Sequence, residues 1–150
     1  GRKIVATPWK KAKDTLSHVH FLKTTEKELK LVASSCRDEE EAVEWIMDQG
    51  PKILIVTRGA RGASVFSKRE KISIPAPPAS TVDPTGAGDV FVLAFLAMYL
   101  KSSDIQNSAA YAGAYAALST ESFGPSLKFE KKKVQAYLKI IKNAITIHSR

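Results

Sequence analysis

Residues 82–89 read Val82-Asp83-Pro84-Thr85-Gly86-Ala87-Gly88-Asp89, and the rest of the chain is best interpreted outward from this stretch. It lies between a proline-rich connector at 75–78 and a long apolar run at 90–100. Two glycines around one alanine at a helix start leave several backbone N–H groups with little side-chain bulk over them. Those first N–H groups lack partners within the helix, and the helix dipole adds partial positive charge there. The stretch therefore predicts an anion site that suits a phosphate group.

Asp89 is unexpected in such a site, because a carboxylate repels a phosphate. Its presence is explained if it accepts a proton from an attacking hydroxyl while the amides hold the transferring phosphoryl group. A purely structural interpretation stays open, in which Thr85 caps the helix, the glycines relieve a tight turn and Asp89 complements the dipole. The stretch is not a P-loop, and it is not a dinucleotide fingerprint, because Phe91 stands where a third glycine is needed.

The segments before this stretch predict alternating helices and strands. Short apolar runs at 3–6 and 19–22 are candidate strands, and helices are expected at 25–33 and after Asp38, which forms a capping box with Glu41. Gly50 and Pro51 end the second of these helices. The run at 53–56 is typical of a parallel strand covered on both faces. The runs at 63–66 and 72–74 predict an antiparallel hairpin.

The segments after it predict helices only. The helix at 86–100 is apolar on all sides and is expected to be central and buried. Ser103 and Gln106 predict the cap of a helix that ends near Ser119. A last helix is expected to start near Phe129, with residues 134, 138, 141 and 145 in one buried stripe. Together these elements indicate an α/β layered fold.

Composition narrows the classes of function. The 150 residues, expected to form one domain, carry a formal net charge of +8, but the basic residues are scattered and no aromatic residues interleave with them. This pattern favours a solvated basic face, suited to a nucleotide, over a nucleic-acid surface. The single Cys36 excludes an internal disulfide framework and fits a reducing compartment. No N-terminal signal is visible and no apolar run is long enough to span a membrane, so we expect a soluble, cytoplasmic protein.

The stretch from Asp83 to Asp89 resembles the C-terminal signature of the ribokinase-like (PfkB) family, usually Asp-Thr-x-Gly-Ala-Gly-Asp. The form with Pro84 also occurs in that family, including its inositol-kinase-like members. The resemblance implies that Asp89 is the catalytic base and that the amides of Gly86, Ala87, Gly88 and Asp89 form an anion hole for the γ-phosphate. It also implies ATP and Mg²⁺ as cofactors, and a monovalent cation such as K⁺ beside Asp83 and Thr85, which some members hold.

Two further segments support the resemblance. Thr57-x-Gly59-x-x-Gly62 resembles the family's nucleotide-contacting motif, in which glycines after a strand let a ligand approach the backbone. Taken alone, it equally describes a turn between strands. Residues 111–118, followed by Gly124 and Pro125, resemble the small-residue helix beside the adenine, which implies nucleotide contacts at Gly113 and Ala117. Family members often have Asn at the position of Gly113, so one hydrogen bond to adenine or ribose has no counterpart here.

Thr25-x-x-Glu28 falls where the family has Asn-x-x-Glu. The resemblance implies that Glu28 organises the water shell of Mg²⁺. The same residues also form a capping box, which alone would explain them.

The resemblance covers essentially the whole chain but only the latter half of a family member. The part that supplies a Gly-Gly motif, most sugar contacts and a lid has no counterpart here. We therefore expect residues 1–150 to be the C-terminal nucleotide-binding and catalytic part of a PfkB-type kinase, with a three-layer αβα Rossmann-like sheet that lacks its first strands. The open sheet edge favours pairing with a separate N-terminal half or a second copy.

The implied activity is transfer of the γ-phosphate of ATP to a hydroxyl of a sugar, cyclitol or nucleoside. An alternative is an ATP-binding or assembly module that is catalytically silent because the substrate half is absent. A third, a basic nucleic-acid binder, would show binding that weakens steeply with salt and ignores ATP.

Overall fold

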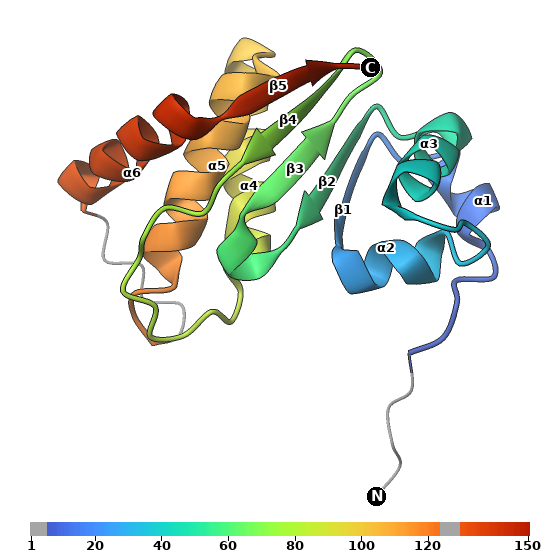
Figure 1. The fold of residues 1–150 in the computed structure, drawn as a ribbon, viewed down its shortest axis with the longest axis horizontal. Coiled ribbons are helices and arrows are strands. Elements are labelled where there is room, and N and C mark those ends of the chain that lie inside the picture. The colour runs from blue at the N-terminus through green and yellow to red at the C-terminus, as the bar shows by residue number, and fades with distance from the viewer. Residues whose placement is uncertain (1–5, 124–129) are drawn as a thin grey trace, which may run out of the picture.

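The structure, a computed structural model, describes residues 6–123 and 130–150, which fold around one five-stranded sheet (Figure 1). The strands lie in the order β1 (Phe21–Thr25), β2 (Ile53–Thr57), β3 (Ala63–Phe66), β4 (Glu70–Ile74) and β5 (Thr146–Ser149). β1 and β2 are parallel, and every later pair is antiparallel. The predicted parallel strand is therefore parallel on one side only, and the predicted hairpin of β3 and β4 is confirmed.

The four apolar residues at the start of β2 explain why helices cover both faces of the sheet. Ile53 and Ile55 belong to one buried cluster, and Leu54 and Val56 belong to another. Successive side chains of a strand point to opposite faces, so a strand buried on both faces needs apolar residues at every position. The result is three layers, helices on sheet on helices, which confirms the predicted fold class.

One face carries α1 (Ala12–Leu16), α2 (Glu26–Val32) and α3 (Glu39–Gln49). The predicted inward positions of α3 are buried: Ala42, Val43, Ile46 and Met47. Asp38 accepts from the amide of Glu41 at 2.9 Å, but the Glu41 carboxylate binds the amide of Arg37 instead of closing the box. α3 ends at Gly50, as predicted.

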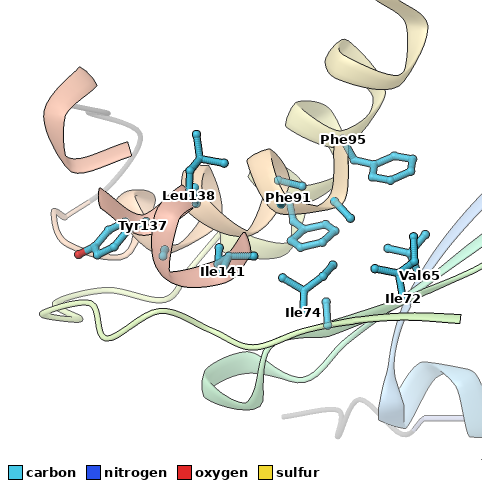
Figure 2. Close-up of a cluster of buried hydrophobic side chains, with 14 of the residues drawn as sticks. Val65, Ile72, Ile74, Phe91, Phe95, Tyr137, Leu138 and Ile141 are labelled. Carbon is cyan, nitrogen blue, oxygen red and sulfur yellow. The ribbon is translucent and has the colours of Figure 1, made fainter. Parts of the chain in front are cut away.

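The other face carries α4 (Ala87–Ser102), α5 (Ile105–Ser119) and α6 (Lys131–Ala144). Figure 2 shows Phe91 of α4 above Ile74 of the sheet, and Phe95, Val65 and Ile72 belong to the same buried cluster, together with Tyr137, Leu138 and Ile141 of α6. α5 lies between α4 and α6. Most of its alanines, among them Ala109, Ala112 and Ala114, are buried, and their small side chains leave room for the two flanking helices.

The expectation that α4 is central and buried is wrong. Only Phe91 and Phe95 of this helix are buried, whereas Leu93 is 65% exposed and Leu100 is 79% exposed. The sheet and α5 cover one side of α4, and no element in the described part of the chain covers the other side. An all-round apolar helix thus has an open apolar face here.

Several predicted boundaries also need correction. α5 is capped by Asp104, which accepts from the amide of Asn107, while Ser103 has a φ of 56° and ends α4. α6 ends at Ala144, so Ile145 lies beyond it, and the unpredicted β5 follows. Phe129 and residues 3–5 lie outside the described residues, and Ala6 is in no strand. The run at 19–22 becomes a strand only from Phe21.

Candidate active site

The predicted site residues gather at one edge of the sheet. The parallel ladder pairs Thr25 with Thr57, so β1 and β2 end at the same level. α2, which carries Glu28, begins directly after β1, and the loop with Gly59 and Gly62 follows β2. α4 also begins at this edge (Figure 1). The contact between the side chain of Lys23 on β1 and Gly88 of α4 agrees with this position. Carboxyl ends of parallel strands are where open α/β sheets bind ligands.

α4 begins without a side-chain cap. Its N-cap is Gly86, which has a φ of 79°, a left-handed conformation that glycine adopts at little cost. The amide of Thr85 donates to Oδ1 of Asp83 at 2.9 Å, which fixes the turn before the helix. The structural alternative in which Thr85 caps the helix is therefore wrong. The α4 amides are left to other acceptors.

The four amides of the predicted anion hole are not equivalent. Ala87 donates to the carbonyl of Pro84 at 3.2 Å, and Asp89 donates to that of Gly86 at 3.0 Å. The amides of Gly86 and Gly88 find no acceptor among the described residues. A Cβ on Gly86 would have nothing within 4 Å, so this part of the turn faces open space. Asp89 is exposed in the first turn of α4.

The loop after β2 closes on itself. Arg58 donates its amide to the carbonyl of Gly62 at 2.8 Å, and Gly62 donates back to that of Gly59 at 2.9 Å. A Cβ on Gly62 would lie 2.0 Å from the carbonyl oxygen of Ile74, so packing alone requires glycine there. At Gly59 a Cβ would meet nothing within 4 Å, and the φ is +58°. Gly59 is the position of this motif that leaves space for a ligand.

Arg58, which the sequence analysis did not single out, holds this loop to the helices beside it. Its guanidinium pairs with Glu26 of α2 at 3.2 Å and with Glu39 of α3 at 2.5 Å, and its side chain is 13% exposed. Arg61 also pairs with Glu26. No motif marks these pairs in the sequence, because the partners come from three elements. They tie the loop to the helix that carries Glu28.

Gly113 and Ala117 lie on the core side of α5. A Cβ on Gly113 would come within 3.0 Å of Cδ1 of Ile141 and 3.2 Å of Cγ2 of Ile74, and Ala117 is 9% exposed. Packing gives a sufficient reason for small residues here. Ile74 also contacts Gly62, so the two predicted nucleotide segments are neighbours. Their contact with adenine stays a prediction, and Gly124 and Pro125 lie outside the described residues.

Glu28 forms the predicted capping box with Thr25 through one of its two carboxylate oxygens. Its Oε2 accepts from the amide of Thr25 at 2.7 Å, and its own amide donates to Oγ1 of Thr25 at 3.2 Å. The Thr25 amide is the largest cause that lowers the pKa of Glu28, and Lys23 contributes. Oε1 accepts from no described residue. Mg²⁺ usually keeps several waters and takes one or two carboxylates plus substrate phosphates, so a lone carboxylate fits it.

Metal binding by protein ligands alone finds no support. In residues 6–123 and 130–150 no group of three His, Cys, Asp or Glu side chains could hold an ion. Asp83 and Thr85 meet through the hydrogen bond described above, and a K⁺ site beside them remains a prediction.

The family follows from comparison with known sequences. The model of the pfkB family of carbohydrate kinases matches residues 3–132. This chain belongs to the pfkB family. The resemblance stated from the motifs is thereby confirmed. Membership of the inositol-kinase-like branch stays a prediction.

Named relatives of this pfkB chain act on different acceptors. A cytidine kinase of Thermococcus kodakarensis is 32% identical over 96 residues, which are 63% of this chain and 34% of that protein. A fructokinase-2 of Oryza sativa subsp. japonica is 36% identical over 85 residues, 57% of this chain and 25% of that protein. A putative ribokinase II from E. coli, solved with ATP and Mg²⁺, superposes with a TM-score of 0.77 at 29% identity, covering 85% of this chain and 42% of that one.

The pfkB chain therefore spans about a third or less of these curated relatives and less than half of the solved kinase. None of its predicted site residues lines the hollow of about 480 Å³ that lies against Arg58, Lys71, Pro75 and Ala144. Of the predicted site residues, Gly59, Gly86 and Asp89 are exposed. No helix among the described residues is both long and apolar enough to cross a membrane.

Proposed function

We propose that this chain carries the nucleotide-binding and phosphoryl-transfer site of an ATP-dependent kinase that phosphorylates a hydroxyl of a sugar, cyclitol or nucleoside. The observation that carries the proposal is the uncapped, glycine-rich start of α4, with two amides that lack a described acceptor and an exposed carboxylate in the same turn. Family membership supports phosphotransferase chemistry, and the printed names of relatives, a cytidine kinase and a fructokinase, support the acceptor classes.

The proposed chemistry assigns separate roles to these groups. Asp89 accepts the proton of the acceptor hydroxyl as its oxygen attacks the γ-phosphorus. A new P–O bond forms, the bond between the γ-phosphorus and the bridging oxygen breaks, and ADP leaves with that electron pair. The amides of Gly86 and Gly88 donate to the charged phosphoryl oxygens. The amides of Ala87 and Asp89 join them only if they exchange their present acceptors for ligand oxygens.

The cofactor assignments belong to the same proposal. Glu28 is placed to hold Mg²⁺ through water, because its Oε1 accepts from no described residue while Oε2 is fixed by the cap. Mg²⁺ supplies neutralisation of phosphate charge when it is bound. Asp83 and Thr85 are assigned to a monovalent cation such as K⁺, because their turn directly precedes Gly86.

A second candidate function is ATP binding without transfer. The open site favours it, since phosphoryl transfer needs the acceptor held in line and water kept out. Offering fructose, ribose, cytidine and myo-inositol with ATP discriminates the two. A phosphorylated acceptor supports the kinase, whereas ATP binding with no phosphorylated acceptor and no ADP formed supports the silent module.

The first test is a calorimetric titration of the chain with Mg-ATP beside a Gly88→Val variant. Valine would place its Cβ 3.1 Å from Nζ of Lys23 and obstruct the turn, so we expect saturable binding by the wild type and at least about tenfold weaker binding by the variant. Ala6→Val, which adds bulk at an exposed position, is the control. A folded wild-type chain that does not bind Mg-ATP contradicts the nucleotide site.

A further inference from the structure

Lys23 is a positively charged residue beside the candidate site, and it belongs to none of the sequence motifs described above. On β1, Phe21 packs edge-to-face on Tyr99 of α4, with ring centroids 5.5 Å apart. Residues two apart on a strand share a face, so Lys23 also points toward α4. Lys23 lies two residues nearer than Phe21 to the carboxyl end of β1. Its ladder partner Ile55 belongs to the buried cluster between the sheet and α4. The side chain thus extends along the sheet toward the start of α4.

The end of this side chain lies against the glycine turn. A Cβ on Gly88 would be 3.1 Å from Nζ and 3.2 Å from Cε of Lys23. These distances are tighter than ordinary van der Waals contact, so the absence of a side chain at Gly88 leaves room for the ammonium. This accounts for Gly88 independently of its amide. It also places a full positive charge beside one of the two amides that have no described acceptor.

The electrostatics of this arrangement call for an anion. The start of a helix carries partial positive charge, and a cation is unfavourable there. Among the described residues, the ammonium of Lys23 makes no ion pair and no hydrogen bond to a side chain. Its field reaches Glu28, where it adds to the lowering of the carboxyl pKa. A multiply charged oxyanion between Lys23 and the Gly86 and Gly88 amides would satisfy all three donors at once.

We propose that Lys23 binds the terminal phosphate of ATP, so that the site distinguishes a nucleoside triphosphate from a diphosphate. The inference rests on the proposed kinase function and adds a residue and a ligand preference to it. A lysine ammonium is a compact point charge on a flexible stem, which lets it follow a phosphate that changes position. In this proposal the amides of Gly86 and Gly88 bind the phosphate oxygens. Lys23 neutralises the negative charge of the terminal phosphate, which ATP has and ADP lacks.

The test compares ligands as well as variants. Wild type, Lys23→Gln and Lys30→Gln are titrated by calorimetry with Mg-ATP, Mg-ADP and inorganic tripolyphosphate. Lys30 is an exposed lysine of α2, so its variant has the same net charge as Lys23→Gln. We expect Lys23→Gln to weaken Mg-ATP binding by about tenfold or more and Mg-ADP binding by much less. Lys30→Gln should leave both ligands close to wild type.

Two further variants at Lys23 test whether a loss of binding comes from the lost charge or from misfolding. Lys23→Arg keeps the charge and should restore most of the preference for ATP, which a merely structural role would not require. Lys23→Met keeps the apolar stem and replaces Lys23→Gln if thermal unfolding shows that variant to be misfolded. Equal losses for ATP and ADP, or an equal loss in Lys30→Gln, would overturn the assignment and leave the proposed function standing.

The remaining outcomes concern the nucleotide function itself. If the wild type binds tripolyphosphate in a Lys23-dependent way but does not bind ATP, Lys23 is a ligand of oxyanions in general, and both the ATP preference and the nucleotide function fail. If a folded wild type binds neither ligand, both proposals fail for this chain.

Discussion

At the scale of single residues, the glycines of this site serve different ends. Gly62 is required by packing, because a Cβ there would lie 2.0 Å from a carbonyl oxygen, and its φ is +88°. Gly59 and Gly86 also have positive φ, yet a Cβ on either would meet nothing within 4 Å. Gly88 leaves room for Lys23. The same residue type thus provides a close contact in one place and ligand space in another.

The assignment of Asp89 is tested by Asp89→Asn in a kinase that carries this sequence. The amide cannot accept the proton of the acceptor, so we expect turnover to fall by a factor of about 10²–10⁴. That fall corresponds to about 3–5 kcal/mol of barrier. Mg-ATP binding should stay similar or become slightly tighter, because a negative charge leaves the site.

Steady-state kinetics of acceptor phosphorylation measure the effect of Asp89→Asn, and calorimetry measures ATP binding. Asp48→Asn on the exposed side of α3 makes the same chemical change far from α4 and is the control. Full turnover by the Asp89 variant would remove Asp89 from the base role.

The glycine stretch could be predicted from the sequence because its reason is local. Gly86, Gly88 and Asp89 follow one another, and the start of a helix has the same unpaired amides in any fold. Lys23 and Arg58 could not be predicted, since a lysine in a strand or an arginine in a loop carries no local signal. Their partners come from other elements, and only the register of the sheet brings them together.

At the scale of elements, one polar cluster joins α6 to the end of α5. Glu121, just beyond α5, accepts from the Tyr137 hydroxyl at 2.5 Å and from Lys133 at 2.8 Å. It also accepts from the amide of Ser80 at 3.3 Å, in the connector that leads to the glycine stretch. The Lys133 bond is the largest cause that lowers the pKa of Glu121. The cluster therefore links α6 to the segment that positions α4.

This cluster predicts a stability change at alkaline pH. Burial, and then the bond to Glu121, raise the pKa of Tyr137 from 10.0 to about 12. Below pH 10 the phenol is protonated in both folded and unfolded chains, so its contribution is complete. Between pH 10 and about 12 the unfolded chain loses the proton first, and the free energy of unfolding falls by about 2–3 kcal/mol.

Tyr137→Phe should remove that part of the alkaline decline, at a cost of about 1 kcal/mol near neutral pH for the lost hydrogen bond. Urea unfolding over this pH range measures both effects, with Tyr111→Phe of α5 as the control. Parallel declines in wild type and Tyr137→Phe would show that the Tyr137 phenol does not contribute.

The elements that were predicted well are those whose pattern depends on their own neighbours. α3 shows a buried stripe at helical spacing, and β3 and β4 are joined by a short turn. α4 was misjudged because an apolar side chain does not reveal what covers it, and Leu93 and Leu100 read like core residues. β5 was missed because Thr146–Ser149 is exposed, so it lacks the apolar alternation that marks a half-buried strand.

At the scale of the whole molecule, two open surfaces lie near each other. Among residues 6–123 and 130–150, β1 has a ladder partner on one side only, and nothing covers the apolar face of α4. Tyr99 of α4 packs on Phe21 of β1, which places the two surfaces side by side. Exposed apolar surface next to an unpaired strand edge favours association.

We therefore expect the chain to self-associate with rising concentration, and the double variant Leu93→Gln, Leu100→Gln to associate less. Because both side chains are exposed, the free energy of unfolding should change by no more than about 0.5 kcal/mol per substitution. Sedimentation velocity over a concentration series measures association, and Lys101→Gln is the control. A wild type that stays monomeric across the series would contradict this expectation.

The pairing of β4 with β5 has a topological consequence. β4 precedes α4, and β5 follows α6, so this ladder joins the two ends of one long loop that contains the whole second helical layer. Closing such a loop carries an entropy cost that the hairpin of β3 and β4 avoids, and contacts so distant along the chain form slowly. β5 is exposed along its length and pairs with β4 alone among the described strands. Fraying of this edge strand would therefore reopen the loop in which Gly86 and Gly88 lie.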